Sequence, residues 1–249
     1  MVDSIRFTIE GPVAELTLCA PERRNAIGAK EIAVVKAALG SVTESCRLFV
    51  IRSEGPVFCA GANLKEITDG TMNGDDFQSM TNAIAELPIP TLAIIEGDVF
   101  GGGAELLFSC DFRLAAEGKK LMIPAAAVGL CYPIEGIERM TQRLGSTLTR
   151  RLLLTTEPVS FDALSHHGVV DWLVPSDSVD AQSAAIIEKL VSLAPMSLGA
   201  MLRIIKMVET NTFDKVLAQT LADECSVSED LKEGLRAQRE KRAPIFQRR

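Results

Sequence analysis

The run Val99-Phe100-Gly101-Gly102-Gly103-Ala104-Glu105-Leu106 comes shortly after the apolar stretch Thr91–Ile95. The apolar, β-branched stretch predicts a buried strand, and residues 104–110 predict a helix. Glycines at such a junction let a ligand approach the backbone, and they leave N–H groups unpaired at the positive end of the helix dipole. The junction therefore suits an anion, or an oxygen that becomes anionic during a reaction.

Glu105 lies in the first turn of the predicted helix. One interpretation is that its carboxylate exchanges a proton with a molecule bound at the glycine run. The other is that the glycines only permit close packing of strand and helix, while Glu105 complements the dipole. The run by itself favours neither interpretation.

A second junction of the same kind lies upstream, in Phe58-Cys59-Ala60-Gly61-Ala62-Asn63-Leu64. Small residues again follow a predicted buried strand and precede a helix. If the two strand ends lie side by side, the N–H groups of Ala62 and Gly102 point at one oxygen. Two such donors form an oxyanion hole, in which the loss of one donor costs roughly 10²–10³ in rate.

Length, composition and net charge limit the classes of protein to which the chain can belong. The chain has 249 residues, 47% of them hydrophobic, which is enough for a sizeable core. A net charge of −7 argues against nucleic-acid binding. The sequence shows neither a membrane-spanning apolar run nor a signal-peptide pattern. The six cysteines are scattered, which favours free thiols in a cytoplasmic protein and predicts no metal site.

The organisation changes along the chain. Residues 5–9 and 13–18 predict a hairpin, and short strands then alternate with helices. The polar segment Thr68–Asp76 predicts a loop covering a pocket. Beyond about residue 134 amphipathic helices dominate, so we expect a core over residues 1–190 and a helical region over residues 191–249.

Several motifs, in order and at fitting spacing, resemble the crotonase family, the enoyl-CoA hydratase/isomerase superfamily. The matching segments are Ala20–Ile27, Phe58–Glu66, Gly101–Leu106 with Cys110-Asp111, Arg143-Leu144-Gly145, Ala163–Pro175 and Glu240–Phe246. The resemblance covers essentially the whole chain. It implies an α/β fold, a crotonase-like spiral of ββα units, whose C-terminal helical region builds a homotrimer or a dimer of trimers.

The resemblance also implies an acyl-CoA-processing enzyme without metal or redox cofactor, whose substrate is a CoA thioester. Ala62 and Gly102 would form the oxyanion hole that stabilises a thioester enolate, and Glu105 would be the acid/base. The residues implied in CoA binding are Arg23, Arg24, Ala60, Ala62, Leu64, Lys241 and Phe246. The matching C-terminal segment in this family sometimes contacts the CoA of a neighbouring subunit.

One position departs from the hydratase pattern. Hydratases of this family use a second glutamate, in a Pro-Glu pair, and the matching residue here is Ala125, which cannot exchange a proton. Tyr132, the only tyrosine, follows shortly after and is the candidate second polar group. A half-buried ring with a satisfied hydroxyl is an equal interpretation of Tyr132.

Three functions therefore stay open. The leading one is hydratase/isomerase-type chemistry on an unsaturated acyl-CoA, a lyase or isomerase reaction. The second is decarboxylation of a malonyl-type CoA with Tyr132, although those decarboxylases carry a histidine where this chain has Ala62. The third is a non-catalytic acyl-CoA-binding protein. His166 and His167 are expected to end a helix, and Asn63 is expected to hold a turn through its side chain.

Overall fold

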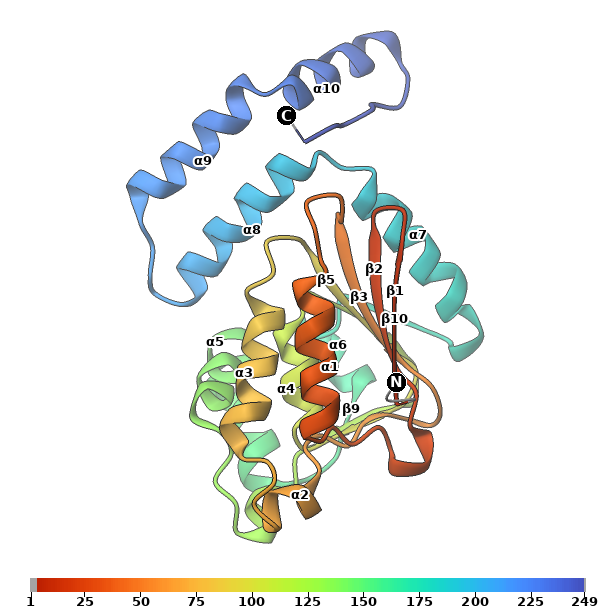
Figure 1. Cartoon of the computed structure of the whole chain (residues 1–249), viewed down its shortest axis with the longest axis vertical. Helices are drawn as coiled ribbons and strands as arrows, with labels where there is room; N and C mark the ends of the chain where they lie inside the picture. The colour runs from red at the N-terminus through yellow and green to blue at the C-terminus, as the bar shows by residue number, and fades with distance from the viewer. Residues whose placement is uncertain (1–3, 249) are drawn as a thin grey trace.

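The computed structural model describes residues 4–248 and arranges their strands in two sheets (Figure 1). The larger sheet has the order β1 (Ile5–Glu10), β2 (Val13–Leu18), β3 (Leu48–Ser53), β5 (Thr91–Ile95), β7 (Phe112–Ala116) and β10 (Trp172–Val174). The smaller sheet has the order β4 (Val57–Cys59), β6 (Asp98–Phe100), β8 (Lys120–Met122) and β9 (Val159–Ser160). The pairs β1–β2 and β8–β9 are antiparallel, and the other neighbours are parallel. The predicted hairpin is confirmed by β1 and β2.

The two sheets are built together by a repeating unit. Each of the pairs β3–β4, β5–β6 and β7–β8 gives one strand to each sheet and is followed by helical chain. The helices after the successive pairs are α2 (Leu64–Thr68) with α3 (Gly74–Ala85), then α4 (Gly103–Ser109), then α5 (Ile134–Arg150). This is the α/β arrangement of ββα units that the resemblance to the crotonase family implied.

Buried side chains on both faces explain why the central strands are apolar throughout. On β3, Phe49 and Ile51 face the main core, beneath α1 (Ala29–Gly40) and α3, whereas Leu48 and Val50 join a second cluster. That second cluster includes residues of α7 (Val179–Val191). Since successive side chains of a strand point to opposite faces, a strand covered by helices on both sides is apolar without alternation.

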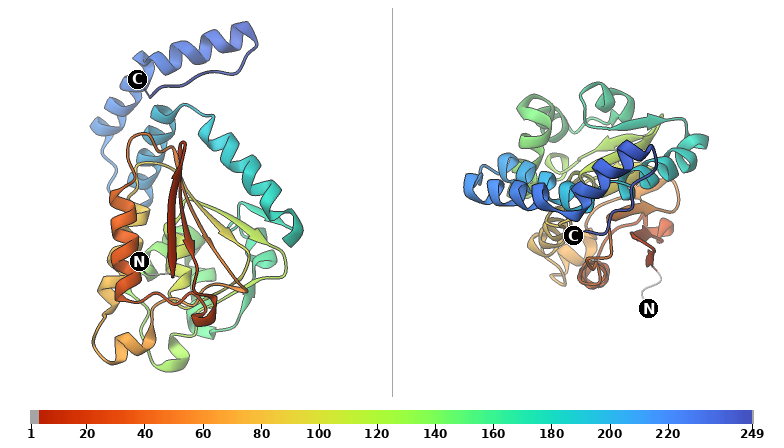
Figure 2. Two further views of the ribbon diagram at one scale, coloured as in Figure 1. Left: turned by 45° about the vertical axis from the view of Figure 1, so that its right-hand side comes forward. Right: turned by 90° about the horizontal axis from the view of Figure 1, so that it is seen from above.

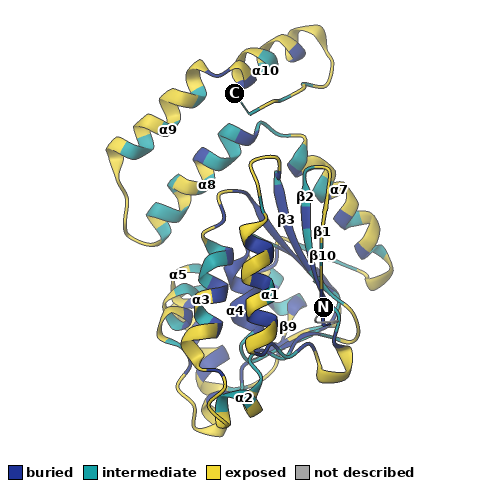
Figure 3. Ribbon diagram, viewed as in Figure 1, coloured by how far each residue is buried: buried dark blue, intermediate teal, exposed yellow. Residues whose placement is uncertain are grey.

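The remaining helices are α6 (Phe161–His166), α8 (Pro195–Glu209), α9 (Lys215–Val227) and α10 (Glu229–Glu240). Helices α8–α10 lie together at one end of the molecule, beyond the sheet (Figure 2). Their surfaces are mostly exposed or half-buried (Figure 3). The division predicted at residue 190 falls at the end of α7. None of the described helices alone is long and apolar enough to cross a membrane; α7 with the preceding turn and α8 qualify only together, and they are bent by 99°.

The predicted loop over Thr68–Asp76 is wrong at its end. Helix α2 includes Thr68, and α3 begins at Gly74, so that only five residues between them are irregular. The reason is a capping box: the Asn73 side chain accepts from the Asp76 N–H at 2.8 Å, while Asp76 accepts from the Asn73 N–H. Such caps satisfy the free N–H groups of a first turn, so a polar stretch can begin a helix.

Candidate active site

The glycine run joins a strand to α4, as the sequence predicted, but the strand directly before it is the short β6 and not the predicted strand over Thr91–Ile95, which is β5 of the other sheet. Gly101 has a left-handed φ of +52°, and its N–H donates to the Met122 carbonyl at 2.9 Å. Its own carbonyl accepts from the N–H of Ala104 in the first turn of α4. The other end of α4 is fixed by Arg143, which donates to the carbonyls of Phe108 and Cys110. Helix α4 is thus held at both ends.

The two glycine-containing junctions lie in direct contact. A Cβ on Gly61, whose φ is +85°, would lie 2.3 Å from the nitrogen of Gly102. A Cβ on Gly102 would lie 3.2 Å from the nitrogen of Ala62, and one on Gly103 would lie 2.4 Å from the Cys59 carbonyl oxygen. The close approach of the backbones therefore requires glycine here. The two strand ends therefore lie side by side, which is the condition on which the predicted oxyanion hole depended.

The hydrogen bonds of the first junction leave the Ala62 N–H free. Ile27 donates to the Gly61 carbonyl, and Asn63 donates to the Ile27 carbonyl, both at 2.8 Å. These bonds form a parallel bridge between Ile27 and Ala62 that does not use the Ala62 N–H. Within residues 4–248, neither the Ala62 nor the Gly102 N–H donates to a protein acceptor. Two neighbouring donors are thus available to a ligand.

Glu105 is buried in the first turn of α4, with 1% of its surface exposed. Its Oε2 accepts from Nη1 of Arg139 on α5 at 2.9 Å. Its Oε1 has no hydrogen-bond partner among the described residues. Burial raises the pKa of Glu105, and the Arg139 cation opposes that rise. A buried carboxyl group with a raised pKa and one oxygen that makes no hydrogen bond is suited to exchanging a proton.

Tyr132 is buried beside this carboxyl group. Its hydroxyl donates to the Gly101 carbonyl at 3.2 Å, so the hydroxyl is satisfied. A Cβ on Gly136 would lie 2.5 Å from Glu105 Oε1 and 3.0 Å from Tyr132 Cε1, so both groups border the same glycine. Burial, and the nearby Glu105, hold the pKa of Tyr132 well above its usual range. A catalytic role for Tyr132 stays a prediction.

Ala125 follows β8 and is nearly buried, at the start of a short helical turn over Ala126–Val128. The first acidic residue after Ala125 in the chain, Glu135, is exposed and accepts a hydrogen bond from the side chain of Asn82. Glu105 is therefore the carboxylate that the glycine junction presents. The side chain of Asn63 caps α2, as expected, by accepting from the Lys65 N–H at 3.2 Å. His166 and His167 are exposed at the end of α6.

The residues implied in CoA binding fall into two groups. Ala60 and Leu64 lie at the first junction with Ala62, and Leu64 is 62% exposed. Near them, the Arg24 guanidinium lies 4.5 Å from the ring centre of Phe100 in β6. Arg23 pairs with Glu31 at 3.0 Å.

The second group of residues implied in CoA binding lies far from the glycine junctions. Lys241 ends α10, and Phe246 follows it in the C-terminal segment. Helix α10 is at the opposite end of the molecule from α2, which begins at Leu64 (Figure 1). A single copy of the chain therefore does not bring Lys241 and Phe246 to the glycine junctions.

Sequence reasoning missed Arg139 and Asn82. Arg139 lies on a strongly amphipathic helix rich in charged residues, where an arginine resembles an ordinary surface residue. Asn82 lies in the middle of α3 without any motif around it. Arg139 contacts both Asn82 and Glu105 only because three helices pack together, and this packing leaves no local pattern in the sequence.

The family model for enoyl-CoA hydratase/isomerase matches residues 8–249. The chain belongs to this family. An enoyl-CoA isomerase/hydratase of Mycosarcoma maydis is 30% identical, over 94% of this chain and 92% of that protein. A carnitinyl-CoA dehydratase of Salmonella typhi is 28% identical over the full length of both proteins.

Solved structures agree on the fold. A crystal structure of an enoyl-CoA hydratase/carnithine racemase from Magnetospirillum magneticum superposes with a TM-score of 0.92 at 24% identity. The superposition covers 100% of this chain and 97% of that one. The crotonase-like α/β fold expected from the sequence motifs is thereby confirmed.

Proposed function

We propose that this member of the family acts on a CoA thioester by moving a proton at the carbon next to the thioester carbonyl. The N–H groups of Ala62 and Gly102 bind the thioester oxygen and stabilise the enolate. Glu105 takes the proton and returns it. This chemistry consists of proton transfers, so it needs neither a metal nor a redox cofactor.

One observation carries the proposal. A buried carboxyl group, whose Oε1 has no hydrogen-bond partner among the described residues, lies in the first turn of α4. The residue before this helix, Gly102, offers a free N–H beside that of Ala62. An oxygen bound by both N–H groups would acquire negative charge as Glu105 removes the proton. Preorganised donors stabilise such charge better than water does, because they need no reorientation.

The absence of a carboxylate at residue 125 bears on the type of reaction. Addition of water in this family relies on two glutamates, whereas migration of a double bond needs one group that takes a proton from C2 and gives it to C4. Glu105 alone can perform the second task. Within the hydratase/isomerase class, we therefore favour isomerisation of an unsaturated acyl-CoA over hydration.

The test is to incubate the protein separately with a 3-enoyl-CoA, crotonyl-CoA and methylmalonyl-CoA, and to follow each product by mass and retention time. We expect conversion of the 3-enoyl-CoA to its 2-enoyl isomer, lost in Glu105→Gln. Loss of CO₂ from methylmalonyl-CoA, abolished by Tyr132→Phe, would replace the proposal with a decarboxylase. Tight CoA binding without any turnover would replace it with a binding protein.

The C-terminal helices support a second proposal, that the chain assembles into a homotrimer or a dimer of trimers. Large apolar side chains are exposed along α8 and α9, and Val216 is the most exposed of them at 77%. The exposed group consists of Met201, Ile205, Val208, Phe213, Val216 and Val227. Large exposed apolar side chains gathered on two helices in contact, and on the loop between them, favour an interaction site.

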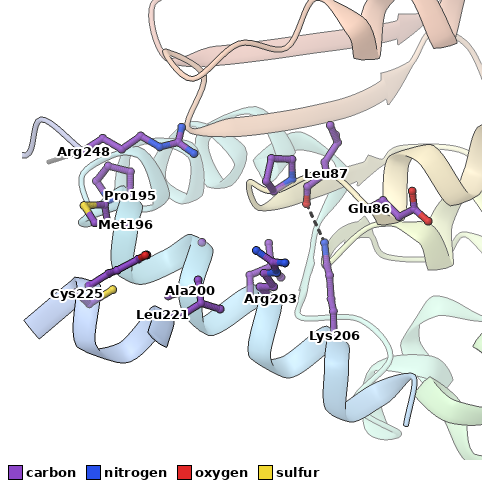
Figure 4. Close-up of a pocket in the computed structure, with 14 residues that line it drawn as sticks. Glu86, Leu87, Pro195, Met196, Ala200, Arg203, Lys206, Leu221, Cys225 and Arg248 are labelled. Carbon is purple, nitrogen blue, oxygen red and sulfur yellow. Dashed lines mark hydrogen bonds between the residues drawn. The ribbon is translucent and has the colours of Figure 1, made fainter. Parts of the chain in front are cut away.

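The packing of α8 and α9 on their own chain is incomplete. A cavity of about 410 Å³ lies between these helices and the residues that follow α3 (Figure 4). It is bridged at one point by the Lys206 ammonium, which donates to the Leu87 carbonyl at 3.1 Å. We propose that a second copy of the chain covers this side of α8 and α9. This arrangement would also explain the position of Lys241 and Phe246, which would then reach the CoA site of a neighbouring subunit.

A further inference from the structure

Arg139 reaches Glu105 from α5 and is held from two sides. Its Nη1 donates to Glu105 Oε2 at 2.9 Å, and its side chain is only 14% exposed. Its other terminal nitrogen, Nη2, donates to Oδ1 of Asn82 on α3. A planar guanidinium bound at both tips has little freedom to turn away from the carboxylate.

Asn82 is itself fixed. Its amide nitrogen donates to the carboxylate of Glu135, which lies one helical turn before Arg139 on α5. Glu135, Asn82, Arg139 and Glu105 thus form a continuous chain of hydrogen bonds across three helices. The chain ends on one oxygen of Glu105 and leaves the other, Oε1, without a partner among the described residues.

The Oε1 side of the carboxylate, which is buried without a hydrogen-bond partner, is bordered by Gly136. A Cβ at this position would lie 2.5 Å from Oε1 of Glu105, so any larger residue would push the carboxylate away. Helix α5 therefore acts on Glu105 twice. It supplies the cation that holds Oε2, and it supplies the residue without a side chain that leaves room for Oε1.

We propose that Arg139 is a positioning residue that holds Glu105 as a carboxylate and restricts proton transfer to its Oε1 atom. The inference rests on the proposed function, because it concerns the same site. In the forward step the C2–H bond of the acyl-CoA breaks, the proton passes to Oε1, and the electron pair moves to the thioester oxygen. In the reverse step Oε1 returns the proton to carbon, and the thioester carbonyl forms again.

The charged groups around Glu105 act in opposite directions. Burial and the negative charge of Glu135 raise the pKa of Glu105, and the cations of Arg139 and Arg143 lower it. Tyr132 stays neutral near pH 7, because its pKa is raised well above the usual range. Arg139 is the cation in direct contact. Its removal therefore raises the pKa of Glu105 further, and less carboxylate is present at a given pH.

The test measures exchange of the C2 protons of butyryl-CoA in D₂O as a function of pH, because this exchange does not require the natural acyl group. In Arg139→Gln we expect the exchange rate to fall at pH 7 and its rising limb to move to higher pH. In Arg139→Lys the rising limb of the pH profile should stay nearer to that of the unmodified protein, because the positive charge is kept. The maximal rate of exchange should fall, because the hydrogen bond to Asn82 is lost. Arg150→Gln, an exposed arginine at the end of the same helix, is the matched control and leaves the profile unchanged.

Two outcomes overturn the proposal. One is a profile for Arg139→Gln that coincides with that of the unmodified protein. The other is a uniform fall in rate at every pH, which indicates that the substitution only loosens the fold.

A second measurement separates this inference from the proposed function. The pKa of Glu105 is followed in the ligand-free protein by ¹³C NMR of labelled glutamate side chains, with Glu105→Gln to assign the signal. If the unmodified protein exchanges no proton of any acyl-CoA, the proposed function fails, and this titration alone decides the role of Arg139. A higher pKa in Arg139→Gln supports the role, and an unchanged pKa overturns it.

Discussion

Helices α4 and α9 differ most in how far the rest of the chain buries them. All seven residues of α4 are buried, and α9 contains no buried residue in thirteen. Helix α4 carries Glu105 and is enclosed by its own chain (Figure 3). Helix α9 exposes Val216 and Val227 to solvent. The comparison teaches that the chain encloses the glycine junction by itself, whereas it leaves α9 exposed, which is the surface that the proposed assembly would cover.

The difference also separates two kinds of stabilisation. Around α4, close backbone contacts and paired polar groups fix the geometry, so small changes in volume are costly. Along α8 and α9, apolar surface remains to be buried, at about 25 cal/mol per Å². Changes in the first region should affect chemistry and folding, and changes in the second should affect assembly.

The largest effect is expected from Gly61→Ala in the core. The new Cβ would lie 2.3 Å from the Gly102 nitrogen, and φ at this position is +85°. Strain alone costs about 1–3 kcal/mol, and the clash with backbone adds to it while separating the two N–H donors. We expect a lower unfolding free energy in urea and a loss of acyl-CoA turnover.

Gly118→Ala is the matched control for this change. Gly118 has a similar φ of +73°, but nothing lies within 4 Å of the Cβ position. It should lose about 1–2 kcal/mol from backbone strain and keep its turnover. If both variants behave alike, the contact between the two junctions is not what fixes the site.

A substitution in the C-terminal helices is expected to change the mass of the assembly and to leave the reaction of the active site unchanged. Ile205→Asp places a charge on the exposed apolar face of α8, where Ile205 is 54% exposed. Burial of an unpaired charge in an interface is unfavourable, so the assembly should dissociate toward the monomer. The measurement is light scattering after size-exclusion chromatography, together with circular dichroism to show an intact fold.

Ile9→Asp provides the comparison from the core region, because Ile9 is an exposed apolar residue on the edge strand β1. Its variant should keep the mass of the unmodified protein. The proposal of assembly through α8 and α9 fails if Ile205→Asp also keeps that mass, or if the unmodified protein is monomeric.

The smallest effect is expected at the C-terminal segment. Arg242 donates to both carboxylate oxygens of Glu233 on α10, and this pairing lowers the pKa of Glu233 to about 2. Because the folded pKa lies below the usual value of about 4.3, the stabilisation is present above that value and is lost as the pH falls through about 2. The pairing is exposed, so its effect is small.

Glu233→Gln tests this pairing at neutral pH. Amide hydrogen exchange of residues 241–247 should be faster in the variant, and the rate of acyl-CoA turnover should not change. Glu240→Gln leaves the Glu233 carboxylate in place and serves as the control. Identical exchange in Glu233→Gln and the unmodified protein would show that Arg242 does not hold the segment.

The sequence predicted the glycine junctions and their neighbours well, because these features are local. A strand, small residues and a helix follow one another in both segments, and a contact between them needs only adjacent parallel strands. The predicted loop end at Asp76 was wrong because α3 begins at Gly74, and the capping box of Asn73 that starts it lies in a stretch as polar as a loop. Tyr132 and its hydroxyl partner Gly101 could not be paired from sequence, since 31 positions separate them.

The contact of α5 with Glu105 could not be predicted from the sequence either. Arg139 meets Glu105 from 34 positions away and Asn82 from 57, so three helices must pack before the chain of hydrogen bonds exists. The same holds for Lys241 and Phe246. Motif matching placed them in CoA binding, but one copy of the fold does not bring them to the site.

The most direct test of the central claim is the exchange of C2 protons of butyryl-CoA in D₂O, compared between the unmodified protein and Glu105→Gln. We predict deuterium incorporation in the first and a rate lower by roughly 10²–10⁴ in the second, the range for loss of a general base. CoA affinity should be the same in both. Equal incorporation by the two proteins would contradict the assignment of Glu105 as the group that moves the proton.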